Sequence, residues 1–303
     1  MADRRILVVA NKWWEADPLC AVLIHDRARP KSFADFTFQG YPAHRAIKPP
    51  PNAPRPADPP ATPRLTFNCN GDRVEVWCIE ELMNPAESSS SSLEKARVLP
   101  SAFAYGPTPA LVVAFGTAGI REGVHANGSA VIGRRVFIHD PLRGAASRQG
   151  LWTPPMPDQL LESALPANKL GQFDERGRYA AEARFLTPPI DSAAPPLVLV
   201  GNGLASLGVV NITNYDDYTW ADQSAVNAFA AAKAPAQIGS IETTHGIIFS
   251  ASTAPFVYVS GITDTEGLFD FQVPPRLYAQ NTVAAHNAAI ALAWMLPSVL
   301  ATL

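Results

Sequence analysis

The sequence has few cysteines, few charged residues and no excess of charge of one sign. Charged residues make up 17% of the 303 positions, and the net charge is −3. A balance this close to neutral argues against a protein that coats nucleic acid or an anionic membrane surface. Cys20, Cys69 and Cys78 lack the spacing of a metal site, and an odd number of cysteines cannot all pair. We expect reduced thiols in a cytoplasmic protein.

Long apolar runs are scarce too. The run at residues 6–10 is too short for the apolar core of a signal peptide. We find no other stretch with the roughly 18 consecutive apolar residues that a membrane-crossing helix needs. Proline, in contrast, is concentrated, because residues 42–63 contain nine prolines among 22 positions. Proline lacks an amide donor and has a fixed backbone angle, so we expect an extended surface insertion in a single domain that spans residues 1–303.

Short apolar runs predict the strands of a buried sheet. They lie at residues 6–10, 110–120, 195–208 and 256–264, and each ends in or leads into small or polar residues. Runs of this kind are typical of strands that are covered on both faces. We expect these four strands to form the centre of the molecule.

Helical segments alternate with the apolar runs. Asp17 and Pro18 predict the start of a helix, and the alanine content of residues 225–234 predicts another. Residues 281–300 predict a long amphipathic helix. The pair Asn70-Gly71 lies between two alternating runs and predicts a β-hairpin. This alternation argues for an α/β fold with a mostly parallel or mixed sheet.

Polar or small residues follow all four predicted core strands, in the segments "ANKWWE", "FGTAG", "GNGLAS" and "GITDTE". In open α/β sheets, ligands bind beyond the carboxyl ends of the strands. We therefore expect these four segments to meet around one site. The last of them places Asp264 at the end of a buried strand.

Five segments resemble, in their order, the nucleoside phosphorylase and nucleosidase superfamily, and in particular its methylthioadenosine nucleosidase and uridine phosphorylase branch. They are "AFGTAGI", "GSAVIGRRVFIHD", "SIETTHG", "FVYVSGITD" and "NAAIALAWML". The resemblance covers most of the chain outside residues 42–63 and 84–105. It implies a three-layer α/β/α domain with a mixed, partly barrel-like central sheet, in a homo-oligomer. It also implies cleavage of the N-glycosidic bond of a nucleoside, without a metal or an organic cofactor.

The same resemblance implies two catalytic carboxylates. Asp264 matches the aspartate that protonates the departing base, and a general acid is needed there because the base leaves as an anion. Glu15 matches by its spacing the glutamate that positions or activates water. The alternatives are that Asp264 caps a following helical turn and that Glu15 is a first-turn glutamate favoured by the helix dipole.

The resemblance further implies which residues touch the substrate. The glycine turn at residues 116–119 would meet ribose or phosphate, and Tyr215 or Tyr218 would contact the base. Independently of the resemblance, Trp13 or Trp14 beside Glu15 would stack on a base or form a wall of the cleft. The alternatives are a tight turn without a ligand, a core tryptophan and a polar loop. The implied substrate-binding residues are Gly116, Thr117, Ala118, Gly119, Glu242, Thr243, Thr244, His245, Tyr215 and Trp13.

One departure from the family concerns the sugar. Purine-nucleoside members carry a glutamate–methionine–glutamate run whose second carboxylate binds the ribose hydroxyls. Here Glu242 matches the first carboxylate, but Thr244 stands in place of the second, and a threonine cannot accept two hydrogen bonds in the same way. Either the sugar is held differently, by Glu242 or His245, or the substrate is not an ordinary ribonucleoside, or catalysis has been lost.

The other departure concerns phosphate. The family's phosphorylases bind it with arginines, but the first loop here offers only Lys12, and no basic residue precedes Gly116. We therefore expect water rather than phosphate as the nucleophile, and a nucleosidase that acts on a nucleoside or related N-riboside. One alternative is a phosphorylase that uses Lys12 and residues of a neighbouring subunit. Another is a protein that binds a base or nucleoside without turnover.

Overall fold

A computed structural model describes most of the chain. The described residues are 3–25, 32–39, 57–58, 60–121, 128–141, 151–152, 198–201, 203–211, 218–232, 236–266, 277–301 and 303. The predicted proline-rich insertion at residues 42–63 lies outside them, apart from residues 57–58 and 60–63.

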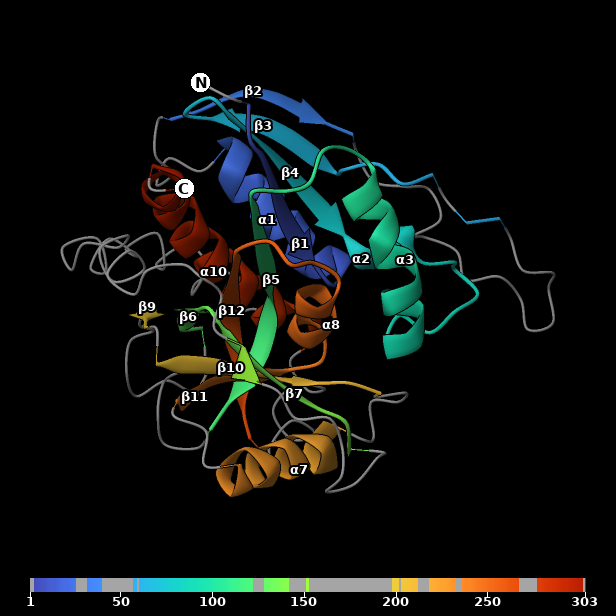
Figure 1. Ribbon diagram of the computed structural model, residues 1–303, viewed down its shortest axis with the longest axis vertical. Coiled ribbons are helices and arrows are strands. Elements are labelled where there is room, and N and C mark those ends of the chain that lie inside the picture. The colour runs from blue at the N-terminus through green and yellow to red at the C-terminus, as the bar shows by residue number, and fades with distance from the viewer. Residues whose placement is uncertain are drawn as a thin grey trace.

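One mixed sheet of twelve strands runs through the described residues (Figure 1). Its order is β2 (Phe33–Phe38), β3 (Leu65–Cys69), β4 (Asp72–Cys78), β1 (Arg5–Ala10), β5 (Leu111–Ile120), β11 (Gln237–Glu242), β10 (Leu204–Val209), β7 (Arg135–His139) and β8 (Leu151–Trp152). In addition, β12 (Phe256–Thr265) pairs with β5 and with β6 (Ala130–Gly133), and β6 pairs with β9 (Val198–Val200). The central pairs β1–β4, β1–β5 and β5–β12 are parallel, whereas β5–β11 is antiparallel. The predicted mixed α/β sheet is thus confirmed.

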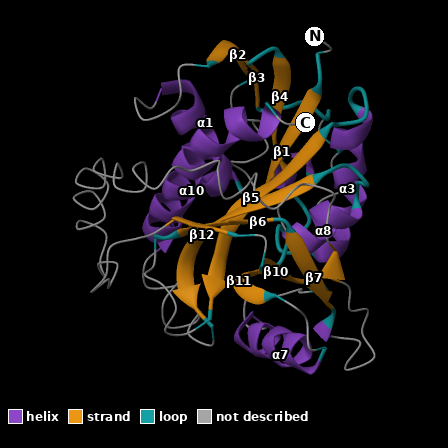
Figure 2. Cartoon of the chain, turned by 60° about the vertical axis from the view of Figure 1, so that its left-hand side comes forward, coloured by secondary structure: helices purple, strands orange, loops and turns teal. Residues whose placement is uncertain are grey.

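Helices cover both sides of the central strands (Figure 2). On one side, α1 (Trp13–His25) packs against α10 (Leu277–Leu300). On the other side lie α3 (Ser92–Ala104), which follows the short α2 (Ile79–Leu82), and α8 (His245–Ser250). A further helix, α7 (Tyr218–Ala231), packs on β10 and β7. This arrangement gives the three layers that the resemblance implied.

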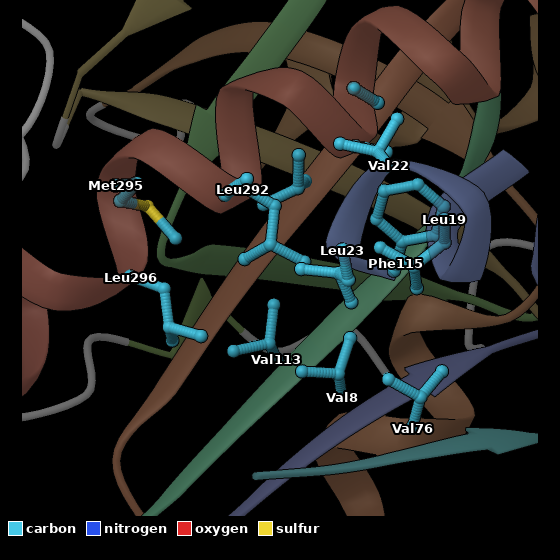
Figure 3. Close-up of a cluster of buried hydrophobic side chains, with 14 of the residues drawn as sticks. Val8, Leu19, Val22, Leu23, Val76, Val113, Phe115, Leu292, Met295 and Leu296 are labelled. Carbon is cyan, nitrogen blue, oxygen red and sulfur yellow. The ribbon is translucent and has the colours of Figure 1, made fainter. Parts of the chain in front are cut away.

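The core on the α1 and α10 side is made of interleaved aliphatic side chains (Figure 3). Leu19 and Leu23 of α1 and Leu292 of α10 meet Val8 of β1 and Val113 of β5, and all five are fully buried. Burial of each such side chain contributes roughly 1.5–3 kcal/mol. The two strands that lead to the candidate site are therefore held from this side by dense packing.

The helix α10 corrects two expectations. Its segment Asn281–Leu300 has a mean hydropathy of 1.5, which makes it, by length and composition, the single helix of the described part that could span a bilayer. However, 78% of that window is buried inside the protein. A helix that is apolar all round belongs in a core, so the predicted amphipathic character, and the absence of a long apolar span, were both wrong.

The predicted glycine turn at residues 116–119 is also wrong, because β5 continues through it to Ile120. In contrast, the predicted strand at residues 256–264 is confirmed, since β12 runs from Phe256 to Thr265. The two strands remain paired from Phe256↔Val112 to Thr265↔Ile120. Each therefore satisfies the backbone groups of the other, which keeps a glycine-containing segment extended.

Two boundaries differ from prediction for local reasons. The helix predicted to start at Asp17 begins at Trp13, and Pro18 lies inside it. The predicted third strand is divided, since a turn around Gly201 separates β9 from β10. The hairpin at Asn70 and Gly71 is confirmed, with φ angles of 54° and 92° that a tight turn between β3 and β4 requires.

A buried arginine fixes α3 to the sheet. Arg5 of β1 donates two hydrogen bonds to Glu75 Oε2, at 3.0 and 2.8 Å. The same guanidinium donates to the carbonyl oxygens of Ala102, Phe103 and Pro107, at 2.7, 3.0 and 2.9 Å. These carbonyls lie at the C-terminal end of α3, where helical acceptors lack partners within the helix. One side chain thus holds two strands and a helix end together.

Replacement of Arg5 by methionine is expected to destabilise the protein by about 3–5 kcal/mol, because Glu75 stays buried without its main partner and three carbonyls lose a donor. Urea unfolding measures the change. Arg97→Met is the matched control, since Arg97 on α3 makes a largely exposed ion pair with Asp58 and should matter little. Equal effects of the two substitutions would contradict this account.

Candidate active site

Glu15 is a buried carboxylate that joins the start of α1 to β5. Its Oε2 accepts a hydrogen bond from the Lys12 amide at 2.8 Å. Its Oε1 accepts from the Thr117 amide at 2.7 Å and from Thr117 Oγ1 at 2.9 Å. Burial raises the pKa of Glu15, and the donors from Thr117 and Lys12 oppose that rise. Glu15 lies in the first turn of the helix, so a structural role at the helix start is compatible with a chemical one.

Asp264 lies in β12, just after a bulge. The register shifts between Ile262 and Asp264, and Asp264 then pairs with Gly119 of β5. A bulge re-aims the side chains that follow it. Thr263 Oγ1 donates to Asp264 Oδ1 at 2.6 Å, and Asp264 is 2% exposed. The alternative role as a helix cap does not apply, because Asp264 is part of a strand.

The two glycines of residues 116–119 leave room for these carboxylates. A Cβ atom on Gly116 would lie 3.2 Å from Glu15 Oε1, and one on Gly119 would lie 2.9 Å from Asp264 Oδ2. Thr117 donates to Glu15, and Gly119 faces Asp264. Both carboxylates therefore contact the same short segment of β5.

Glu242, at the end of β11, binds the first turn of α8. Its Oε2 accepts from the amides of Thr244 and His245, the latter at 2.6 Å, and its Oε1 accepts from Ser206 Oγ at 3.2 Å. Burial raises the pKa of Glu242 to about 7. Ser206 Oγ also lies 3.1 Å from His245 Nδ1, and burial lowers the pKa of His245 to about 3. His245 is therefore a neutral imidazole at neutral pH.

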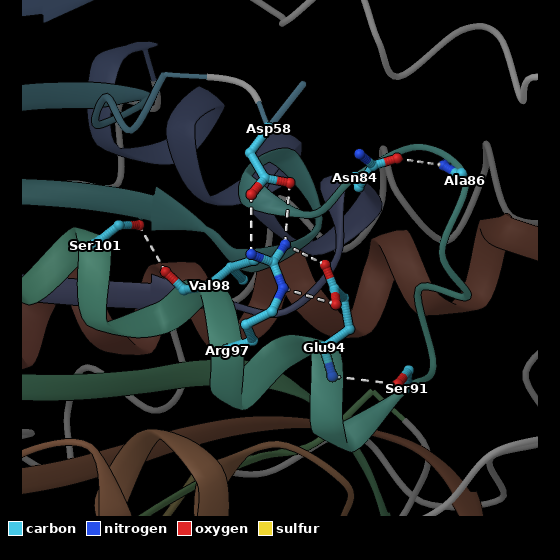
Figure 4. Close-up of polar contacts among 8 residues, drawn as sticks. All are labelled: Asp58, Asn84, Ala86, Ser91, Glu94, Arg97, Val98 and Ser101. Carbon is cyan, nitrogen blue, oxygen red and sulfur yellow. Dashed lines mark hydrogen bonds and ion pairs between the residues drawn. The ribbon is translucent and has the colours of Figure 1, made fainter. Parts of the chain in front are cut away.

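Lys95 is a buried cation beside this group. The helix that carries it, α3, is capped by Ser91, which accepts from the Glu94 amide at 3.2 Å, and is tied by Arg97 to Asp58 (Figure 4). Lys95 Nζ donates to Thr244 Oγ1 at 3.1 Å, and Lys95 is 0% exposed. Burial and, next, the charge of Lys12 lower the pKa of Lys95 to about 7, against the opposing influence of Glu242, Glu15 and Glu80.

A small cavity of about 20 Å³ lies among these groups. Such a volume suits a water molecule or a single ligand group, and it is far below the roughly 300 Å³ or more that encloses a small-molecule ligand. Two of the four segments that were expected to meet, "ANKWWE" and "FGTAG", line it, together with the "IETTHG" run. The lining residues are Asn11, Glu15, Phe115, Gly116, Thr117, Glu242, Thr243, Thr244 and His245.

The other predicted residues lie as follows. Asp264 and Ala118 do not line the cavity, and the Ala118 carbonyl oxygen lies 3.3 Å from Thr263 Oγ1. Trp13 is partly buried against the core, and its amide donates to Glu80 Oε2 at 3.0 Å. Tyr215 lies outside the described residues. Among the residues that the structure describes, no group of three or more His, Cys, Asp or Glu could hold a metal ion.

The "GNGLAS" segment reaches the site through its last residue, Ser206, which lies in β10 and whose Oγ is 3.1 Å from His245 Nδ1. The sequence reasoning missed Lys95, Asn11 and Phe115. A signal for Lys95 was present, because Lys95, Val98, Leu99 and Ala102 form the buried face of α3 at helical spacing. A lysine in such an apolar stripe indicates a buried amine.

Comparisons with known proteins support the fold. No protein-family model and no curated protein matches the chain. Solved structures do, and they assign it the fold of the nucleoside phosphorylase and nucleosidase superfamily. The implied resemblance is thereby confirmed at the level of fold.

Three of these structures serve as examples. A 5′-methylthioadenosine/S-adenosylhomocysteine nucleosidase from Colwellia psychrerythraea, in complex with adenine, is 15% identical with a TM-score of 0.51, over 98% of this chain and 96% of that chain. The nucleosidase of Neisseria meningitidis, in complex with methylthio-immucillin-A, is 14% identical with a TM-score of 0.51, over 97% and 99%. Futalosine hydrolase of Helicobacter pylori is 11% identical with a TM-score of 0.51, over 99% of each chain.

Gly119→Ala is expected to displace the Asp264 carboxylate with a stability change within about 1 kcal/mol, because the contacted atom is the movable end of a side chain. A crystal structure and urea unfolding test this. Gly71→Ala is the control: its φ of +92° strains any other residue, so it should destabilise the fold without moving Asp264. An unmoved Asp264 in the Gly119 variant would refute the close packing.

The buried amine predicts a pH-dependent stability. The folded-state pKa of Lys95 is about 7, below its ordinary 10.5, so the folded state binds fewer protons between these values. The buried ammonium of Lys95 therefore destabilises the folded state to its full extent below pH 7. This destabilisation decreases as the pH rises from 7 towards 10.5. Lys95→Met should be more stable than wild type below pH 7, by a margin that shrinks above it. Urea unfolding across this range, with Arg97→Met as control, measures the effect. Parallel stability curves for wild type and Lys95→Met would exclude it.

Proposed function

We propose that the protein hydrolyses the N-glycosidic bond of a nucleoside or related N-riboside. One observation carries this proposal: two buried carboxylates, Glu15 and Asp264, contact the same strand segment, residues 116–119. Cleavage of this bond needs an acid for the departing base and a base for the attacking water. A pair of carboxylates held by separate sets of contacts can divide these two tasks.

In the proposed reaction, Asp264 in its protonated form gives its proton to the base as the bond between nitrogen and C1′ breaks. The bonding electron pair leaves with the base. Water forms the new bond to C1′, and Glu15 accepts a proton from that water. Burial raises the pKa of Glu15, which makes it a better proton acceptor than an exposed carboxylate. The water-sized cavity beside Glu15 suits this step.

The structural neighbours support a nucleoside as substrate. Two of them are nucleosidases with adenine or an immucillin bound, and a third is a futalosine hydrolase. We also propose, on the resemblance, that the protein is a cytoplasmic homo-oligomer of single-domain chains that carry the proline-rich insertion at residues 42–63.

Phosphorolysis is the second candidate, because Lys95 adds a second buried cation near Lys12. Water is preferred for two reasons. The cavity holds about 20 Å³, and the Lys12 amine already donates to the Ser89 carbonyl at 2.6 Å. A phosphate dianion is bound best by several donors in a fixed geometry.

The test is base release from a panel of purine, pyrimidine and 5′-modified nucleosides, with and without phosphate. Asp264→Asn and Glu15→Gln are each expected to lower the rate about 10²–10⁴-fold, because each removes a proton-transfer group but keeps its shape. Asp72→Asn is the matched control, since Asp72 is a buried carboxylate bound by Arg4 at the start of β4. Release that requires phosphate would establish phosphorolysis instead. No release from any nucleoside, but saturable binding of one, would favour a binding protein.

A further inference from the structure

The hydroxyl of Thr244 is held in one orientation by Lys95. A lysine ammonium has three hydrogens to donate and no lone pair to offer. Thr244 Oγ1 must therefore be the acceptor in the 3.1 Å contact with Lys95 Nζ. A threonine hydroxyl has a single hydrogen, and that hydrogen is left to point away from the ammonium. Thr244 lines the cavity, so the hydrogen is available there.

Glu15 provides the opposite polarity in the same cavity. A carboxylate only accepts hydrogen bonds, and Glu15 is one of the lining residues. A water molecule of the size that the cavity admits would accept from Thr244 and donate to Glu15. That orientation is the one from which Glu15 can take a proton in the proposed hydrolysis.

We propose that Lys95 is a positioning residue, which acts through Thr244 to orient the nucleophilic water towards Glu15. This inference rests on the proposed hydrolysis. Lys95 does not touch the reacting atoms, and its role is to make Thr244 a hydrogen-bond donor rather than an acceptor. The residue that replaces a carboxylate of related enzymes thereby gains a function of its own.

The surroundings of Lys95 fit a chemical role better than a purely structural one. Among the described residues, Thr244 Oγ1 is the hydrogen-bond partner of its amine, and no ion pair joins that amine to a carboxylate. A buried ammonium with a single hydrogen bond is unfavourable for folding. Ser91 nevertheless caps α3 (Figure 4), and Lys95 lies on the buried face of that helix.

The arrangement also makes the orientation sensitive to pH. A neutral amine has a lone pair and can accept from Thr244, which would turn the hydroxyl hydrogen away from the cavity. Charged neighbours influence the pKa of Lys95. They are Lys12, which directly precedes α1, and the carboxylates of Glu15, Glu80 and Glu242. With a pKa of about 7 for Lys95, the proposed rate should fall as the pH rises through neutrality. The pKa of Glu242 lies in the same range, so the Glu242→Gln variant separates the effect of Glu242 on the rate from that of Lys95.

The kinetic test compares Thr244→Val, which keeps the shape but removes the hydroxyl, with Thr244→Ser, which keeps the hydroxyl. The substrate is the panel nucleoside that wild type cleaves fastest. We expect kcat to fall about 10²-fold in Thr244→Val and in Lys95→Met, with little change in KM, because the water is misplaced rather than the substrate. Thr244→Ser should retain most activity. The alkaline fall of kcat should persist in Glu242→Gln and be absent from the residual activity of Lys95→Met.

Two kinetic results would overturn the inference: equal activity of the valine and serine variants, or a loss in Lys95→Met that is confined to KM. A structural readout keeps it separate from the proposed function. High-resolution crystal structures of wild type and Lys95→Met should show a water bonded to Thr244 Oγ1 and Glu15 in the first and displaced in the second. If wild type releases no base, the proposed function fails. In that case the crystal structures still test the role of Lys95. A water that is absent from wild type, or that keeps its place in Lys95→Met, refutes the role. A water that is present in wild type and displaced in Lys95→Met supports it.

Discussion

The pairing of β12 with β5 is the constraint on which the site depends. Two parallel strands of ten residues each remain in register past the point where glycines and polar residues would ordinarily end a strand. Because each backbone satisfies the other, the segment around Gly116 and Gly119 stays extended and can present contacts on one face. The bulge before Asp264 then changes the direction of a single side chain without ending the pairing.

The buried charges of this protein follow a common design, in which one side chain links elements that are distant in sequence. Arg5 ties β1, β4 and the end of α3, while Glu15 ties α1 to β5. Glu242 holds the start of α8. Each carboxylate receives two or more donors, which offsets the free energy of removing a charge from water. Among the described residues, the amine of Lys95 has Thr244 Oγ1 as its hydrogen-bond partner and no carboxylate at ion-pair distance, so its charge is less well compensated than these.

The sequence predicted the elements but not how far they extend. The apolar runs around Val8, Val113 and Val257 identified core strands because burial on both faces leaves a composition that is readable without a structure. Strand ends were misplaced because pairing partners decide them, and a partner such as β12 for β5 is invisible in a single segment.

The same division applies to the site. Glu15 and Asp264 were predicted from resemblance and spacing. The structure adds a reason for Gly116 and Gly119, because a Cβ atom at either position would crowd one of these carboxylates. Lys95 comes from a segment far from any motif, and only the folded chain brings it to Thr244. Long-range contacts of this kind have no counterpart in local periodicity.

The burial of most of α10 has a consequence for mutational tolerance. An ordinary surface helix has an exposed face on which substitutions accumulate with little effect, so tolerance along it repeats with the period of the helix. In α10 almost every position from Ala284 to Leu296 meets packed neighbours. Its tolerance should therefore be low around the whole circumference, and a record of accepted substitutions would show an unbroken block of small and aliphatic residues rather than a periodic stripe.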